Sequence, residues 1–146
     1  MNTVGDVSVE TASRGVLPSQ DAWRAAAACH EELFAPLDPG ARIALLAREA
    51  PTNMLVWEAG DAGVDACVEA FAGYAASQAD VVLAADDASL ERIRAATGTA
   101  LFVELRAGIR SGHIVCYMLK RRCVLEERGF DEILDALGFA FMGACR

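Results

Sequence analysis

Apolar residues recur at helical spacing along much of the chain. In the segment 53–77 they stand at the i, i+3, i+4, i+7 and i+11 positions of one helix face, at Val64, Cys67, Val68, Phe71 and Ala75. A half-buried strand would instead alternate apolar and polar residues with a period of two. The pattern therefore predicts an amphipathic helix within this segment.

Helix start and stop signals frame three further segments. Segment 19–34 opens with the cap-type residue Ser19 and ends before Pro36, while segment 38–50 opens with Asp38 and a proline and ends before Pro51. Segment 87–105 carries its apolar pattern across Gly98, where we expect a kink. All three are predicted to be helical.

Residues 114–119, with the sequence IVCYML, are apolar on every side of a helix. A helix without a polar face is typically surrounded by other helices, so we expect this one at the centre of the fold. Asp131 is in position to cap a last helix over 132–144. The short apolar run 79–84 fits either a strand or a helical turn.

These segments predict an all-α fold, a globular bundle of about seven helices around a buried hydrophobic central helix. Residues 1–18 mix Gly, Ser, Thr and Pro without periodicity, and we expect a flexible tail there, followed by one domain over 19–146. The alternative is a mixed α/β fold with 54–57, 80–84 and 101–105 as strands. Periodicity alone leaves that alternative open.

Charge and composition limit the classes of partner that the chain is expected to bind. With 13 basic and 21 acidic residues the net charge is -8, which repels phosphate backbones, so we expect no nucleic-acid partner. No apolar run approaches the ~20 residues that span a bilayer, although an anchor beyond Arg146 stays open. The five cysteines share no repeated spacing, which is typical of free thiols in a reducing compartment such as the cytosol.

Catalytic and metal-binding patterns are weak in this sequence. Cys29 and His30 are adjacent on a predicted helix and so point to different faces, which defeats a Cys-His pair. His113, Cys116 and Cys123 lack a fourth ligand and the usual zinc spacing. There is no phosphate-binding loop or nucleophile elbow. We therefore expect no enzyme activity, no catalytic residues, no metal and no cofactor.

Two segments resemble the Bcl-2-like family of apoptosis regulators. Residues 56–74, VWEAGDAGVDACVEAFAGY, are similar to its BH-three segment, with Ala-Gly-Asp at 59–61 followed by Phe71. Residues 104–117, ELRAGIRSGHIVCY, are similar to its BH-one segment, in which Asn-Trp-Gly-Arg leads into the central helix. Gly112 matches the motif glycine, whereas Arg110 stands at the asparagine, Ser111 at the tryptophan and His113 at the arginine. The chain is most similar to the divergent poxviral members.

The resemblance implies an inhibitor of host-cell apoptosis that binds BH-three helices in a hydrophobic groove. Its partners would be the pro-apoptotic proteins Bax, Bak, Bim and Puma. Arg110 or His113 would meet the ligand aspartate at the groove rim. The implied groove residues are Val64, Cys67, Val68, Phe71, Tyr74, Leu90, Ile93, Leu101, Phe102, Leu105, Arg110, Gly112, His113 and Val115.

The family also implies a place in the host cytoplasm, at the cytosolic face of the mitochondrial outer membrane if an anchor follows residue 146. A homodimer is left open. The alternative function, of another class, is a small acidic immunity or antitoxin-type protein of bacterial origin, which binds a partner protein. That alternative predicts a closed core and an acidic binding face, where the first predicts an open apolar groove.

Overall fold

The computed structural model describes residues 15–139 and contains a five-stranded mixed sheet with the strand order β3-β2-β1-β4-β5. The two central strands, β1 and β4, are parallel, and every other neighbouring pair is antiparallel. The strands are β1 (Arg42–Ala47), β2 (Asn53–Gly60), β3 (Gly63–Ala70), β4 (Val81–Ala85) and β5 (Ile114–Met118).

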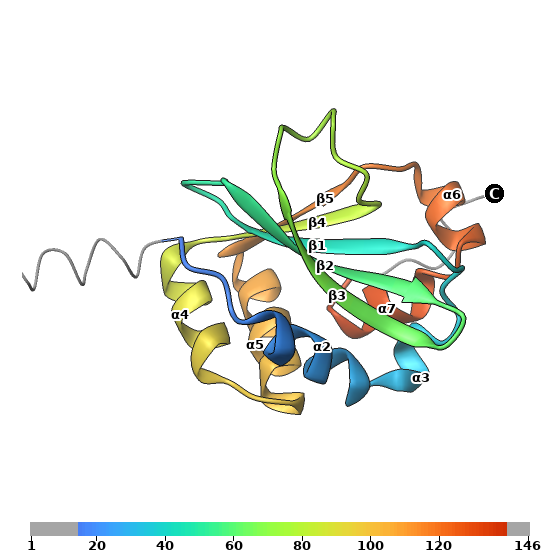
Figure 1. Cartoon of the computed structure of the whole chain (residues 1–146), viewed down its shortest axis with the longest axis horizontal. Coiled ribbons are helices and arrows are strands. Elements are labelled where there is room, and N and C mark those ends of the chain that lie inside the picture. The colour runs from blue at the N-terminus through green and yellow to red at the C-terminus, as the bar shows by residue number, and fades with distance from the viewer. Residues whose placement is uncertain (1–14, 140–146) are drawn as a thin grey trace, which may run out of the picture.

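Helices pack on one face of this sheet (Figure 1). They are α2 (Gln20–Ala28), α3 (Glu31–Phe34), α4 (Asp87–Ala95), α5 (Thr99–Ser111), α6 (Arg122–Glu127) and α7 (Asp131–Ala136). All six contribute buried side chains to one core, which also contains the residues of the sheet that face the helices. The large side chains at its centre include Trp23, Trp57 and Phe130.

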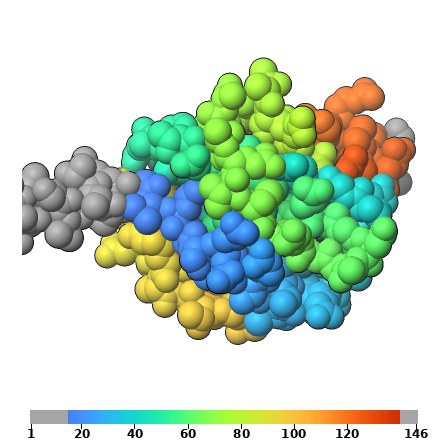
Figure 2. Space-filling view, in the orientation of Figure 1, coloured from blue at the N-terminus to red at the C-terminus, as the bar shows by residue number. Residues whose placement is uncertain are grey.

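Within residues 15–139, the other face of the sheet carries no helix, and we call it the helix-free face. Small and aliphatic side chains line it, among them Ala44, Val56 and Val82, all fully buried. Residues 71–79 connect β3 to β4, and we call them the strap. Phe71 and Tyr74 of the strap pack on the apolar side chains of this face. The strap forms the top of the molecule in Figure 2. Tyr74 also packs on Tyr117 of β5, with ring centroids 4.6 Å apart.

The predicted all-α bundle is wrong, because the protein has an α/β fold. Segment 38–50, predicted as a helix, contains β1, and segment 53–77 forms β2, β3 and part of the strap. A central parallel strand is buried on both faces, so β1 is apolar from Ile43 to Ala47 and shows no alternation there. In β3 the supposed helical stripe divides between the two faces, with Val64 in the helix-side core and Cys67 on the helix-free face.

The predicted central helix at 114–119 is also wrong, because this segment is β5, an edge strand. Its continuous apolar run arises because one side packs on the helix-side core, through Ile114, Cys116 and Met118, while Tyr117 and Leu119 face the other way. Gly112, with φ of 85°, ends α5 in the left-handed conformation and turns the chain into β5.

Other parts of the sequence analysis are confirmed. The helix predicted over 19–34 is present as α2 and α3, and the one over 87–105 is present as α4 and α5, which separate before Gly98. Within the α/β alternative, strands at 54–57 and 80–84 match β2 and β4, but 101–105 lies in α5. The last predicted helix, over 132–144, is present only in part, because α7 ends at Ala136. Its positions after 139 lie outside the described residues, as do positions 1–14 of the expected tail.

The end of the expected tail is fixed to α4. The backbone N–H of Gly15 donates to Asp87 at 2.8 Å, and Arg94 donates to the carbonyl of Val16 at 2.6 Å. Within residues 15–139, none of the helices has the length and apolar character needed to cross a membrane.

Candidate functional site

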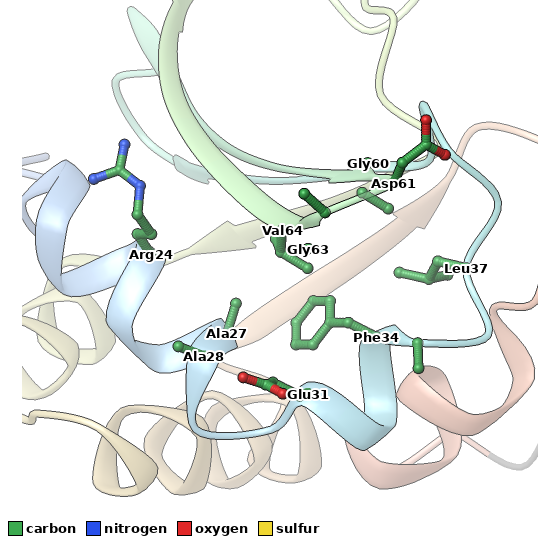
Figure 3. Close-up of a pocket in the computed structure, with 13 residues that line it drawn as sticks. Arg24, Ala27, Ala28, Glu31, Phe34, Leu37, Gly60, Asp61, Gly63 and Val64 are labelled. Carbon is green, nitrogen blue, oxygen red and sulfur yellow. The ribbon is translucent and has the colours of Figure 1, made fainter.

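A cleft of about 530 Å³ lies between α2 and α3 on one side and the β2–β3 hairpin on the other (Figure 3). Its walls are mostly alanine and glycine, and the larger side chains at its floor are apolar. The residues that line it are Arg24, Ala27, Ala28, Glu31, Phe34, Ala35, Leu37, Ala59, Gly60, Asp61, Ala62, Gly63 and Val64.

Small residues create the space. The side chain of Ser19 caps α2 by accepting a hydrogen bond from Ala22 N–H at 3.0 Å, and the alanine run at the end of this helix presents only methyl groups to the hairpin. Opposite, Gly60 pairs with Gly63 across the two-residue turn Asp61–Ala62. Because neither pairing residue carries a side chain, the turn leaves the cleft open at that end.

Three aromatic residues in contact make the floor rigid. Phe34 lines the cleft and meets the ring of Trp57 edge-on, with centroids 5.1 Å apart. Trp57 in turn stacks on Trp23 at 3.7 Å with an interplanar angle of 7°. Figure 3 shows the Phe34 ring projecting into the cavity between the helical wall and Val64. The floor is therefore held by the core and exists before any ligand binds.

The surroundings of the cleft are acidic. Arg24, the one arginine that lines the cleft in the described part of the chain, already pairs with Asp21 at 3.0 Å and Asp65 at 3.3 Å. Within residues 15–139, neither Glu31 nor Asp61 forms an ion pair. The acidic residues of segments 19–41 and 59–66 are Asp21, Glu31, Glu32, Asp38, Asp61 and Asp65, against the single Arg24.

The predicted groove residues do not come together. Only Val64 among them lines the cleft. Phe71 and Tyr74 pack on the helix-free face, Val68 is 51% exposed on β3, and Cys67 lies on the opposite face of the same strand. The predicted second wall is part of the buried core of α4 and α5, at Leu90, Ile93, Leu101, Phe102 and Leu105. The last three predicted positions before β5, Arg110, Gly112 and His113, are exposed, and Val115 is half-buried in β5.

His113 contacts an acid of its own chain. Its Nδ1 lies 2.7 Å from Asp86 Oδ2, and the other carboxylate oxygen accepts the N–H of Ser89 at 2.9 Å as the N-cap of α4. Burial alone would raise the pKa of Asp86, but these hydrogen bonds together hold it below its ordinary value. The contact joins the start of β5 to the start of α4.

A charged cluster on the helix-free face was missed by the sequence analysis. Arg42 of β1, 13% exposed, pairs with Glu58 at 3.3 Å and with Glu69. The hydrogen bond with Glu69 is the main reason why the pKa of Arg42 is raised, and the same bond lowers the pKa of Glu69. These residues stand far apart in sequence, and only the strand register brings them together.

Cys67 and Cys116 are not reactive thiols. Cys29, Cys67 and Cys116 are free thiols, as expected, whereas Cys123 is disulfide-bonded. Burial is the main cause that raises the pKa of Cys67, and it raises that of Cys116 to about 12, so both are poor nucleophiles near neutral pH. Across residues 15–139 no three His, Cys, Asp or Glu side chains are grouped so that they could hold a metal ion.

No family model, curated protein or solved structure matches the chain. The functional argument therefore depends on the geometry of the cleft and on the charges around it.

Proposed function

We propose that this chain is a protein-binding domain whose cleft receives a basic, partly apolar segment of a partner protein. One observation carries the proposal: an apolar floor, held rigid by Phe34, lies inside an acidic rim whose one arginine among residues 15–139 is already paired within the chain. This belongs to the second class given by the sequence analysis, the small acidic protein that binds a partner protein.

The floor supplies binding energy. Burying one leucine or phenylalanine side chain contributes about 1.5–3 kcal/mol, and a preformed cleft requires little ordering of the domain. The rim supplies selectivity. Glu31 and Asp61 attract lysine and arginine, and the net charge of -8 speeds the encounter with a basic partner.

A catalytic role has less support. Among the residues that line the cleft there is no serine, threonine, cysteine, histidine or tyrosine to act as nucleophile or neutral-pH base. The two carboxylates, Glu31 and Asp61, stand on opposite walls and do not point toward one another in Figure 3. Binding is therefore the function that the cleft supports best.

The expectation of binding to BH-three helices stays untested. Its groove was to lie between helices in segments 53–77 and 87–105, and the first of these segments forms β2, β3 and part of the strap. Isothermal titration with Bax, Bak, Bim and Puma peptides is the direct check. Sub-micromolar binding to any of them would revive that function.

The proposal is tested by selecting binders from a random peptide library displayed on phage and measuring their affinities by titration. We expect the selected peptides to combine lysine or arginine with a leucine, phenylalanine or similar anchor. Ala28→Trp should fill the cleft and abolish binding, whereas the matched control Ala95→Trp, an exposed position on α4, should not.

Charge reversal separates the rim from the floor. Glu31→Lys and Asp61→Lys should each weaken the selected peptides about three- to tenfold, and Glu91→Lys, exposed on α4, should leave them unchanged. Peptides that bind equally well to Ala28→Trp and to the unaltered protein would show that the cleft is not the docking site.

A further inference from the structure

Within residues 15–139, strand β3 is an edge of the sheet and pairs only with β2 along its 8 residues. Its outer side is identified by Ala66, whose carbonyl accepts Arg24 Nη2 at 3.2 Å and whose N–H donates to Asp65 Oδ1 at 2.9 Å. Both backbone groups of Ala66 therefore point away from β2. Because ladder hydrogen bonds alternate along an antiparallel strand, the backbone groups of Val64, Val68 and Ala70 point outward as well.

Arg24 and Asp65 act together as a cap on the middle of this edge. The guanidinium of Arg24 contacts both the Asp65 carboxylate and the Ala66 carbonyl, so it occupies the place that a neighbouring strand would take. The cap covers one residue. Within residues 15–139, no hydrogen bond from outside the ladder reaches the outward groups of Val68 and Ala70, and the Val68 side chain is 51% exposed.

The two faces of the edge differ in chemistry. Val64 and Ala66 face the helices, as does Val68 by alternation, and Val64 also lines the cleft. Asp65 and Glu69 lie on the helix-free face, where the Asp65 side chain is 79% exposed. An added strand would therefore meet valine and alanine on one face and carboxylates on the other.

We propose that the partner segment binds as an additional strand along β3, with cationic and apolar residues in alternation. This inference rests on the proposed function and names the conformation of its ligand. The cations lie beside Asp65 and Glu69, the apolar side chains lie beside Val64 and Val68, and the apolar residue next to Val64 reaches the cleft. The partner's cation displaces Arg24 from the Asp65 carboxylate.

A second copy of this chain fits the same edge poorly. If two β3 strands paired antiparallel about Cys67, Asp65 of one copy would face Glu69 of the other. If they paired in parallel and in register, each carboxylate would face its own counterpart. Like charges directly opposite one another destabilise strand pairs, so both of these registers disfavour self-association and favour a basic strand.

The test uses a synthetic peptide of alternating lysine and valine, acetyl-KVKVKVK-amide, with EVEVEVE as its charge-reversed control. We expect KVKVKVK to bind and to slow the amide hydrogen exchange of Val68 and Ala70 at least tenfold, measured by NMR, and EVEVEVE to do neither. Failure of KVKVKVK to bind, or binding without slower exchange at these two amides, would overturn strand addition.

Two N-methylated versions of the peptide provide a control with unchanged side chains. In a strand, only every second residue directs its N–H toward β3. Methylation of one set, the valines or the lysines, should therefore weaken binding about tenfold or more, and methylation of the other set should leave binding unchanged. Equal affinities for the two versions would also overturn the inference. Neither result tests whether the cleft binds a partner, because the library peptides and Ala28→Trp test that proposed function separately.

Discussion

The indole of Trp57 lies flat on that of Trp23 and donates its N–H to the Trp23 backbone carbonyl at 2.6 Å. One residue of β2 thereby fixes both the position of α2 and, through Phe34, the floor of the cleft. The stability of the fold and the shape of the candidate site depend on the same contact.

Replacing this indole should be costly. Trp57→Phe removes the hydrogen bond, leaves the Trp23 carbonyl buried without its side-chain donor and loses part of the stacking, so we expect a loss of about 2–3 kcal/mol in the free energy of unfolding. Urea unfolding followed by circular dichroism measures it. The control Val103→Ala, 61% exposed on α5, should change that free energy by less than about 0.5 kcal/mol. Equal effects would contradict the role given to Trp57.

Gly129 and Gly112 distinguish steric overlap from backbone strain. Both have positive φ, 87° and 85°, but a Cβ at Gly129 would lie 1.9 Å from the Pro36 carbonyl oxygen, while one at Gly112 would meet nothing within 4 Å. Gly112→Ala should therefore cost about 1–2 kcal/mol and Gly129→Ala clearly more. Thermal unfolding of the two variants compares them directly, and similar melting temperatures would show that the contact between Gly129 and Pro36 is dispensable.

The Asp86–His113 contact should make stability depend on pH. The folded-state pKa of Asp86 is lowered, so its contribution is present above the unfolded value of about 3.9 and is lost as the pH falls through the folded value. Asp86→Asn keeps an N-cap acceptor but removes the charge. It should cost about 0.5–1 kcal/mol at pH 7, with the difference disappearing near pH 2.

Denaturant unfolding at both pH values measures this difference, with Glu91→Gln on the exposed side of α4 as the control that should show none. A destabilisation by Asp86→Asn that is as large near pH 2 as at pH 7 would indicate that the amide disturbs the cap and that the charge contributes nothing.

Arg24 should compete with a basic ligand. Arg24→Ala frees the Asp65 carboxylate and the Ala66 carbonyl, so we expect it to raise the affinity for KVKVKVK about threefold or more. Arg92→Ala, which removes an exposed ion pair with Glu104, is the matched control and should leave affinity unchanged. Weaker binding after Arg24→Ala would mean that the guanidinium contacts the ligand itself.

The sequence predicts the helices better than the sheet. Helix ends are marked by local chemistry: Ser19 caps α2, Asp86 caps α4, and Gly98 precedes α5. Prolines give further stop signals, and the observed helices follow these signals. The strands lack such local signals. β1 is apolar on both faces, and β3 lies at an edge where valine, cysteine and alanine imitate a helical stripe.

The sequence analysis did not predict the cleft, and the reason differs from the one that applies to the strands. Phe34 and Val64 stand far apart in sequence and meet only because α2 and α3 pack beside the β2–β3 hairpin. The one local signal was Gly60-Asp61-Ala62-Gly63, two glycines around a two-residue turn, which fits a hairpin as well as the helix motif that it resembled. The acidic rim follows from the same packing.

The parallel pairing of β1 with β4 bears on the order in which the chain folds. Ile43 lies beside Val81, and the whole β2–β3 hairpin and the strap intervene between them. Closing that long loop costs more chain entropy than forming the hairpin across its two-residue turn. We therefore expect pulse-labelled amides of β2 and β3 to become protected before those of β4, so that the edge strand β3 is formed while the centre of the sheet is still incomplete.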